Sequence, residues 1–145
     1  MEFTAEIRKA TDPIYQRISK AVPEIEWPSY APYIYEINKL KKEKNAVILA
    51  HNYQTPEIYH GISDFSADSL ALAVEAAKTK ADIIVMCGVH FMAETAKLMS
   101  PNKKVLLPDM SAGCSLSSSI TGQDVRNLKK KYPGVPVVSY VNTSA

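Results

Sequence analysis

The sequence predicts an α/β fold in which a parallel sheet of about four strands carries helices on its faces. From Ala46 onward, short apolar runs alternate with helical patterns of roughly 10 to 15 residues, which is typical of right-handed βαβ crossovers. Each apolar run also ends in polar or reactive residues, and open α/β sheets bind ligands at the carboxyl ends of their strands. The predicted fold therefore also predicts where the functional residues lie.

Residues 1–45 are expected to form a helical segment that precedes the sheet. The stretches Glu6–Val22 and Tyr33–Lys42 have the spacing of amphipathic helices, and Pro23 and Pro28 lie in the connection between them. Nothing in this segment alternates between strand and helix patterns. We therefore treat it as a helical region added to the α/β domain.

The α/β region is expected to contain four strands and three helices. A capping box of Thr121 and Asp124 indicates the start of the last helix. In chain order, the predicted elements are strand Ala46–Ala50, helix Asp68–Thr79, strand Asp82–Met86, helix Phe91–Leu98, strand Lys104–Leu107, a helix from about Thr121 to Pro133–Gly134, and strand Val137–Val141.

The domain boundaries follow from these elements. Residues 46–135 are predicted to be a first α/β domain, and residues 136–145 the first strand of a second, truncated one. No helix follows the strand predicted at Val137–Val141. A domain rarely stops directly after a strand, so we expect the sequence to be a piece of a longer protein.

Composition and charge exclude several classes of protein. Among the 145 residues, Lys and Arg exceed Asp and Glu by only 2, which is too few for a nucleic-acid-binding protein. No apolar run approaches the roughly 20 residues of a membrane span, and the acidic N-terminus lacks the core of a signal peptide. The sequence therefore predicts a cytoplasmic protein. Two cysteines are too few for a disulfide framework.

Polar and reactive groups gather where the four predicted strands end. In a parallel sheet these four groups would share one edge, and four coincidences are stronger evidence of a site than one motif. The groups are His51, Asn52, Tyr53 and Gln54; Cys87, Gly88 and His90; Asp109, Ser111, Gly113 and Cys114; and Tyr140, Asn142, Thr143 and Ser144.

The histidines differ in what surrounds them in the sequence. His51 has Asn52 and Tyr53 beside it, which favours a functional role over a structural one. His60 lies in a loop without a partner and is expected at the surface. His90 opens a helix, and we expect a structural role for it.

Two further positions offer groups to a ligand. Ser69 opens a helix at the expected sheet edge, where a helix N-terminus can bind anions as well as be capped. Tyr140 and Asn142 are two residues apart, so in a strand they would face the same way and present a phenol and an amide together.

The two cysteines are expected to play different roles. Cys87 closes the apolar run Ile83–Met86, and free cysteine is among the most buried residue types, so we expect core packing. Cys114 lies in a loop of small and polar residues that buries little and lets backbone N–H groups approach a sulfur or an anion. Cys114 is therefore the better candidate for a metal ligand or nucleophile.

Common local motifs leave three hypotheses open. The Rossmann fingerprint, the P-loop, the nucleophile elbow and close CxxC spacing are all absent. The chain could be part of an enzyme with a site at the strand ends. It could instead be a non-enzymatic domain that binds small anions through Ser69 and the strand-end loops. A third possibility is a hydrolase with Cys114 as nucleophile and His51 as base.

Five segments, in order and with their spacing, resemble quinolinate synthase across about residues 35 to 145. The longest, Cys87–Lys97, is also the most specific of them. The segments are Ala50–Gln54, Asp68–Ser69, Cys87–Lys97, Ala112–Leu116 and Tyr140–Ser144.

The resemblance implies a reaction, a fold and partners. The family condenses iminoaspartate with dihydroxyacetone phosphate to quinolinate, a precursor of NAD. Its fold has three similar α/β domains around a pseudo-threefold axis, with a [4Fe–4S] cluster at their junction held by one cysteine from each. L-aspartate oxidase is the expected supplier of iminoaspartate.

The resemblance also implies roles for individual residues. Cys114, not Cys87, matches the cluster ligand. Tyr53 and Tyr140 match catalytic positions that pass protons, and the substrate-binding positions match His51, Ser69, Tyr140, Val141 and Asn142. Only one of three cluster cysteines is in this sequence, so we expect this chain alone to be inactive and to hold no cluster.

Overall fold

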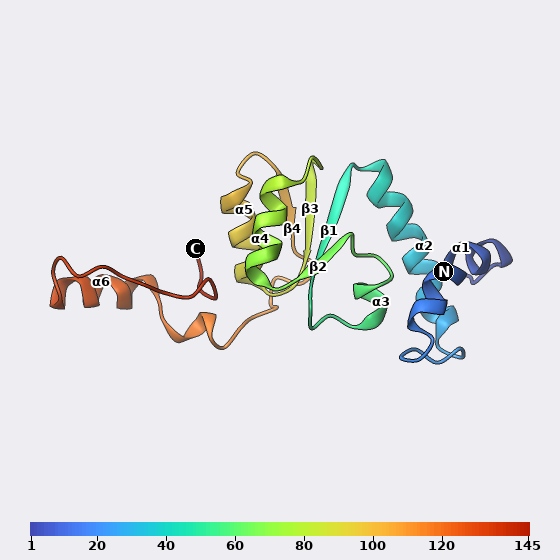
Figure 1. The fold of residues 1–145 in the computed structure, drawn as a ribbon, viewed down its shortest axis with the longest axis horizontal. Coiled ribbons are helices and arrows are strands. Elements are labelled where there is room, and N and C mark those ends of the chain that lie inside the picture. The colour runs from blue at the N-terminus through green and yellow to red at the C-terminus, as the bar shows by residue number, and fades with distance from the viewer.

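A computed structural model describes residues 1–145 and contains one sheet of four strands, all parallel, in the order β2-β1-β3-β4 (Figure 1). The predicted α/β fold class is therefore confirmed. The strands are β1 (Ala46–His51), β2 (Phe65–Ala67), β3 (Ile83–Cys87) and β4 (Lys104–Leu106).

Two helices, α4 (Ser69–Lys78) and α5 (His90–Met99), cover one face of the sheet (Figure 1). The Asp68 side chain caps the N-terminus of α4, because its Oδ1 accepts the Ala71 N–H at 2.9 Å. Alternate residues of β1 and β3 meet these helices, as the two-residue period of a strand requires. The buried cluster between them contains Leu49, Leu72, Ala76, Ile84, Met86, Phe91, Met92 and Ala96.

The opposite face of the sheet meets α2 (Trp27–Glu43) and the short helix α3 (Pro56–Tyr59). The first helix, α1 (Ala5–Ile18), packs on α2, with the Tyr15 and Trp27 rings 5.1 Å apart. The predicted second helix began at Tyr33, whereas α2 begins at Trp27. Pro28 lies in the first turn of α2, where backbone N–H groups have no acceptor within the helix. A proline, which lacks this N–H, therefore costs no hydrogen bond here and is compatible with the start of the helix.

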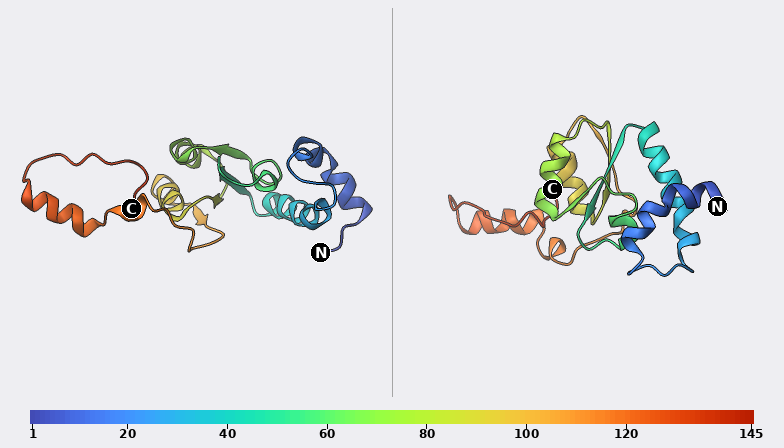
Figure 2. Two further views of the ribbon diagram at one scale, coloured as in Figure 1. Left: turned by 90° about the horizontal axis from the view of Figure 1, so that it is seen from below. Right: turned by 45° about the vertical axis from the view of Figure 1, so that its right-hand side comes forward.

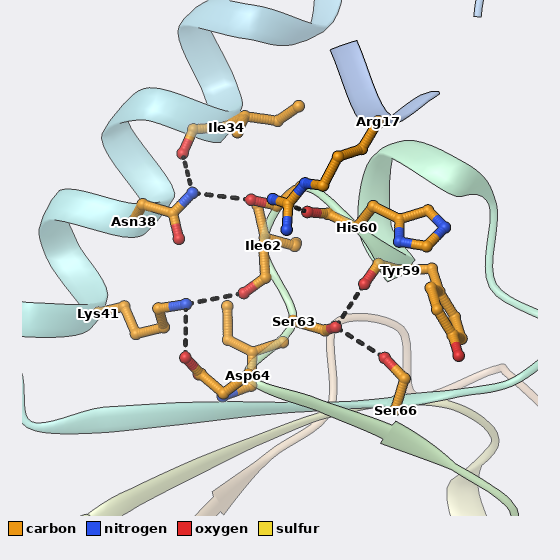
Figure 3. A network of polar contacts seen from close by, with 12 residues as sticks. Arg17, Ile34, Asn38, Lys41, Tyr59, His60, Ile62, Ser63, Asp64 and Ser66 are labelled. Atoms are coloured by element: carbon orange, nitrogen blue, oxygen red, sulfur yellow. Dashed lines mark hydrogen bonds and ion pairs between the residues drawn. The ribbon is translucent and has the colours of Figure 1, made fainter. Parts of the chain in front are cut away.

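A network of polar contacts ties α2 to the loop that leads into β2 (Figure 3). The Lys41 ammonium lies 2.9 Å from Asp64 Oδ1 and donates to the Ile62 carbonyl at 2.9 Å. The other Asp64 oxygen accepts the Ile48 N–H of β1 at 2.8 Å, and Asn38 donates to the Gly61 carbonyl at 2.8 Å. These contacts hold the loop against β1, where the next residues pair as β2.

Two of the strand predictions need correction. Phe65–Ala67 forms a strand, whereas the sequence predicts a connection there. The prediction misses this strand because three residues with a central serine show no apolar run. Val137–Val141, predicted as the fourth strand, forms no strand. A strand needs a neighbouring strand with which its backbone N–H and C=O groups form hydrogen bonds. Residues 137–141 pair with no strand of the sheet.

The chain after β4 runs through a 3₁₀ turn, Ser117–Ser119, into α6 (Gly122–Lys131), which projects away from the sheet (Figures 1 and 2). The predicted capping box is confirmed: the Thr121 Oγ1 accepts the Asp124 N–H, and Asp124 Oδ2 accepts the Thr121 N–H at 2.8 Å. The chain then returns toward α5 (Figure 1). None of the helices has both the length and the apolar character needed to cross a membrane.

Candidate functional site

The candidate site lies at the carboxyl edge of the sheet and is built first from β1 and β2. His51 is the last residue of β1 and pairs in register with Ala67 of β2. The Asn52 N–H donates to the Ala67 carbonyl at 3.1 Å, which extends the pairing by one residue. Because Asp68 and Ser69 follow Ala67 directly, the start of α4 lies beside His51.

The His51 and Tyr53 rings form a tilted pair at this edge. Their ring centroids are 4.1 Å apart with an angle of 36° between the planes. The Tyr53 backbone N–H donates to His51 Nδ1 at 3.4 Å, so the neutral imidazole carries its proton on Nε2. His51 therefore has an Nε2–H that can donate to a ligand.

Burial lowers the pKa of His51 below its ordinary value of 6.5, and the Asp68 carboxylate opposes that shift in part. The imidazole is consequently neutral at pH 7. A neutral donor suits a bound carboxylate because it forms a hydrogen bond without requiring a buried charge.

The lowered pKa of His51 predicts a loss of stability in mild acid. As the pH falls below about 6.5, the unfolded chain binds a proton at His51 before the folded chain does. The free energy of unfolding therefore decreases until the pH reaches the pKa of His51 in the folded state. Urea unfolding between roughly pH 7.5 and pH 5 checks this. In His51→Gln the decline should be shallower than in the wild type.

The matched control for this prediction is His60→Gln, which removes an exposed imidazole outside the site. The difference between the two variants isolates the contribution of His51. Parallel curves for the wild type and His51→Gln would contradict the assignment.

The Tyr53 phenol is placed to hold a proton. Burial raises the pKa of Tyr53 above its ordinary value of 10.0, the Val89 backbone N–H lowers it, and the Cys114 thiol raises it. The net effect is upward, so the phenol stays protonated at neutral pH. Tyr53 can therefore donate a proton or a hydrogen bond to a ligand at this edge.

The Cys114 loop is attached to the start of α5. The His90 N–H donates to the Ala112 carbonyl at 2.7 Å, and Asp109 Oδ1 accepts both the N–H and the hydroxyl of Ser111, at 2.8 and 2.6 Å. These same hydrogen bonds lower the pKa of Asp109. Cys114 is a free thiol, half-buried against the α5 side of the core. Its position is fixed while its sulfur stays accessible.

A cavity of about 400 Å³ opens beside Cys114. Its walls include His90 and Glu94 of α5 and Ser144 near the end of the chain. His90 Nδ1 lies 3.7 Å from Glu94 Oε1, and the Ala145 N–H donates to Glu94 Oε2 at 3.1 Å. The cavity is large enough for a small metabolite or an inorganic group.

Cys87 lies away from this cavity. It is 8% exposed and packs with Ile48 and Ala50 on the face of the sheet that meets α2 and α3. Burial raises the pKa of its thiol. The predicted core role of Cys87 is therefore confirmed, and the distinction between the two cysteines holds in the structure.

The fourth predicted group is not brought to the edge by a strand. Tyr140 is 79% exposed, and Val141, Asn142 and Thr143 are half-buried. Tyr140 and Asn142 lie outside any strand, so the two-residue period of a strand does not place them on one face here. The sheet thus unites three of the four groups, and Ser144 alone of the last group lines the cavity beside Cys114.

The surface position expected for His60 is confirmed, whereas the structural role expected for His90 stays a prediction. His60 is exposed, and its carbonyl accepts a hydrogen bond from Arg17 (Figure 3). His90 is the first residue of α5 and attaches the Cys114 loop through its backbone.

One contact at the edge could not be predicted from the sequence. Met92 of α5 lies beneath the Tyr53 phenol, with Sδ 4.0 Å from Oη. An apolar residue within a helical pattern carries no signal that it faces a site, so only the packing of α5 on the sheet shows this contact.

The chain offers one thiol to a metal cluster. Cys114 has the chemistry and the accessibility of an iron ligand, whereas Cys87 is buried on the opposite face. Nowhere in residues 1–145 do three His, Cys, Asp or Glu side chains come together as a metal site. Cys114 thus fits as one ligand of a [4Fe–4S] cluster, and the remaining ligands would have to come from outside this chain.

Comparison with known proteins gives consistent matches. The chain is 60% identical to a quinolinate synthase of Sinorhizobium medicae over all 145 of its residues, which cover 40% of that relative. It is 63% identical to one of Caulobacter vibrioides over 143 residues, or 99% of this chain and 39% of the relative. For one of Xylella fastidiosa the identity is 64% over 112 residues, or 77% of this chain and 33% of the relative.

The chain thus spans about 40% of the length of the first two of these relatives, and it matches their N-terminal part. The profile of a family described as "Quinolinate synthetase A protein" matches residues 35–145. That range contains the whole sheet and every residue of the edge described above. The chain therefore belongs to the quinolinate synthetase A protein family.

Proposed function

We propose that this chain forms the N-terminal part of a quinolinate synthase, which condenses iminoaspartate with dihydroxyacetone phosphate to quinolinate in NAD biosynthesis. The observation that supports this most is that the family match, residues 35–145, includes both the edge where the His51 and Tyr53 rings meet and the Cys114 loop bonded to the start of α5. Both proposed substrates carry anionic groups, and the edge offers neutral donors to them.

The proposed binding residues are those that present hydrogen-bond donors without charge. His51 donates through Nε2, and Ser69 offers a hydroxyl and the start of α4. The substrate-binding set that we propose contains His51, Ser69, Tyr140, Val141 and Asn142.

The proposed proton-transfer residues are Tyr53 and Tyr140. Forming the pyridine ring requires loss of phosphate, formation of an imine and loss of water, and each step moves a proton. A phenol that is protonated at neutral pH can give a proton to a leaving oxygen and recover it afterwards. Tyr53 meets that requirement by its raised pKa and its place at the edge.

We also propose that Cys114 is one thiolate ligand of a [4Fe–4S] cluster in the complete protein. When bound, an iron without a protein ligand supplies a Lewis acid for a substrate oxygen. The complete enzyme is proposed to be cytoplasmic and to receive iminoaspartate from L-aspartate oxidase.

The C-terminal residues suggest how the remaining domains attach. Val137 is 52% exposed, Val138 92% and Tyr140 79%, so this apolar segment lies open to solvent. We propose that residues 136–145 are the first strand of a second domain and pair with residues that this chain does not contain. Pairing would also move Tyr140 and Asn142 from their present positions.

The test is a chimera in which this chain is followed by the remaining part of the Sinorhizobium medicae relative. After anaerobic reconstitution with iron and sulfide, the chimera should form quinolinate from iminoaspartate and dihydroxyacetone phosphate. The complete relative is the positive control. A chimera that folds and binds a cluster but forms no quinolinate would contradict the proposal.

A further inference from the structure

The end of the Tyr53 side chain rests on a buried methionine. Tyr53 is 55% exposed, yet its Oη lies 4.0 Å from Met92 Sδ, and Met92 is only 4% exposed. The Tyr53 hydroxyl donates this contact to the sulfur, because a thioether is a weak hydrogen-bond acceptor. The phenol thus has an open side toward a ligand and a fixed side toward the core.

Met92 itself is held firmly. It belongs to α5 and lies in the buried cluster with Leu49, Leu72, Met86 and Phe91. Close packing leaves such a side chain little freedom to move. Because Met92 is fixed in the core, its contact with the Tyr53 hydroxyl fixes where that hydroxyl lies.

Gly88 leaves the space in which this contact forms. A Cβ at Gly88 would lie 2.7 Å from Met92 Sδ, 3.7 Å from Tyr53 Oη and 3.8 Å from His51 Cβ. The first distance is shorter than carbon and sulfur atoms can approach without moving. Gly88 is not among the residues with positive φ, so the requirement for glycine here is one of space.

The Tyr53 ring is also constrained by His51. The two rings form a tilted pair with centroids 4.1 Å apart, and the Tyr53 N–H donates to His51 Nδ1. The tyrosine therefore contacts the imidazole of β1 through its ring and the sulfur of α5 through its hydroxyl.

We propose that Gly88 and Met92 are positioning residues that fix the direction of the Tyr53 phenol at the sheet edge. Gly88 provides the room, and Met92 provides the surface on which Oη rests. The consequence for catalysis rests on the proposed function, whereas the effect on the phenol does not. Misplacing a catalytic group by about 1 Å can lower a rate by roughly 100-fold.

The first test follows the phenol directly in the 145-residue chain. Tyrosine labelled with ¹³C at Cζ gives one NMR signal for each ring, and Tyr53→Phe assigns the signal of Tyr53. Gly88→Ala should shift this signal and its titration midpoint, and leave the other tyrosine signals in place. Met92→Leu, which keeps an apolar side chain of similar volume, should shift the same signal by a smaller amount.

Matched controls separate positioning from a general change of the fold. Met86→Leu replaces another fully buried methionine of the same cluster. Gly122→Ala adds a Cβ that meets only the Arg126 guanidinium, at 3.4 Å. Neither should move the Tyr53 signal.

The second test uses the chimera. Gly88→Ala and Met92→Leu should each lower kcat by about tenfold, with KM within roughly twofold of the parent, since the phenol is misplaced for the reaction while substrate binding is retained. The two control substitutions should leave kcat unchanged.

The outcomes are distinct. The proposal is overturned if the Tyr53 signal stays in place in both variants, if it moves equally in the controls, or if kcat is unchanged in an active chimera. If Gly88→Ala fails to fold, Met92→Leu decides the matter. An inactive parent chimera would count against the proposed function, and the NMR result would still decide whether Gly88 and Met92 position the phenol.

Discussion

Replacing Cys114 with alanine in the chimera should abolish both cluster binding and quinolinate formation. [4Fe–4S] clusters are held by cysteine thiolates, and Cys114 is the accessible thiol at the carboxyl edge of the sheet. The visible absorption of the reconstituted protein measures the cluster independently of activity. The far-ultraviolet circular dichroism spectrum should be unchanged, because Cys114 lies in a loop outside the helices and strands.

Cys87→Ala is the matched control, since it removes the other thiol by the same change. Cys87 is buried against Ile48 and Ala50, so its loss should lower the free energy of unfolding by about 1 kcal/mol. The cluster and the activity should persist. A Cys114→Ala protein that keeps its visible absorption, or a Cys87→Ala protein that loses it, would contradict the assignment of the ligand.

Tyr53→Phe should have the second large effect, a fall in kcat of about 100-fold with little change in KM. The substitution keeps the ring that pairs with His51 and removes only the hydroxyl. General acid–base groups typically contribute 10²- to 10⁴-fold to a rate. Steady-state kinetics of the chimera measure the loss, and urea unfolding should show stability within about 0.5 kcal/mol of the parent.

Tyr59→Phe is the matched control for that experiment. Tyr59 lies in α3, in the same connection between β1 and β2, and its ring contacts His60 away from the edge. It should retain full activity. If Tyr53→Phe also retains full kcat, Tyr53 does not transfer protons in the reaction.

The strands and helices that the sequence predicted well are those whose signals are local. The apolar runs at β1, β3 and β4 and the caps of α4 and α6 place these elements within about two residues of their observed bounds. Asp68 and the Thr121–Asp124 pair act on backbone groups within three residues, so the sequence around them is sufficient.

The failures concern pairings that depend on distant residues. Phe65–Ala67 pairs with β1 where Asp64 is held by Lys41, 23 positions away, and by the Ile48 N–H, 16 positions away. Val137–Val141 has the composition of a strand, but composition cannot supply the neighbouring strand that it needs.

The candidate site shows the same division. A strand followed by polar residues was enough to select His51 and Tyr53, and the loop composition was enough to distinguish Cys114 from Cys87. The support of the Tyr53 hydroxyl by Met92 comes from the packing of α5 on the sheet. No local pattern encodes that packing.

The central claim is that the carboxyl edge of this sheet is one wall of a quinolinate synthase site. A crystal structure of the chimera with quinolinate bound tests it most directly. We predict that a carboxylate of quinolinate accepts hydrogen bonds from His51 Nε2 and the Ser69 hydroxyl, with the Tyr53 phenol facing the ring. Quinolinate bound elsewhere, with none of these three residues in contact, would contradict the claim.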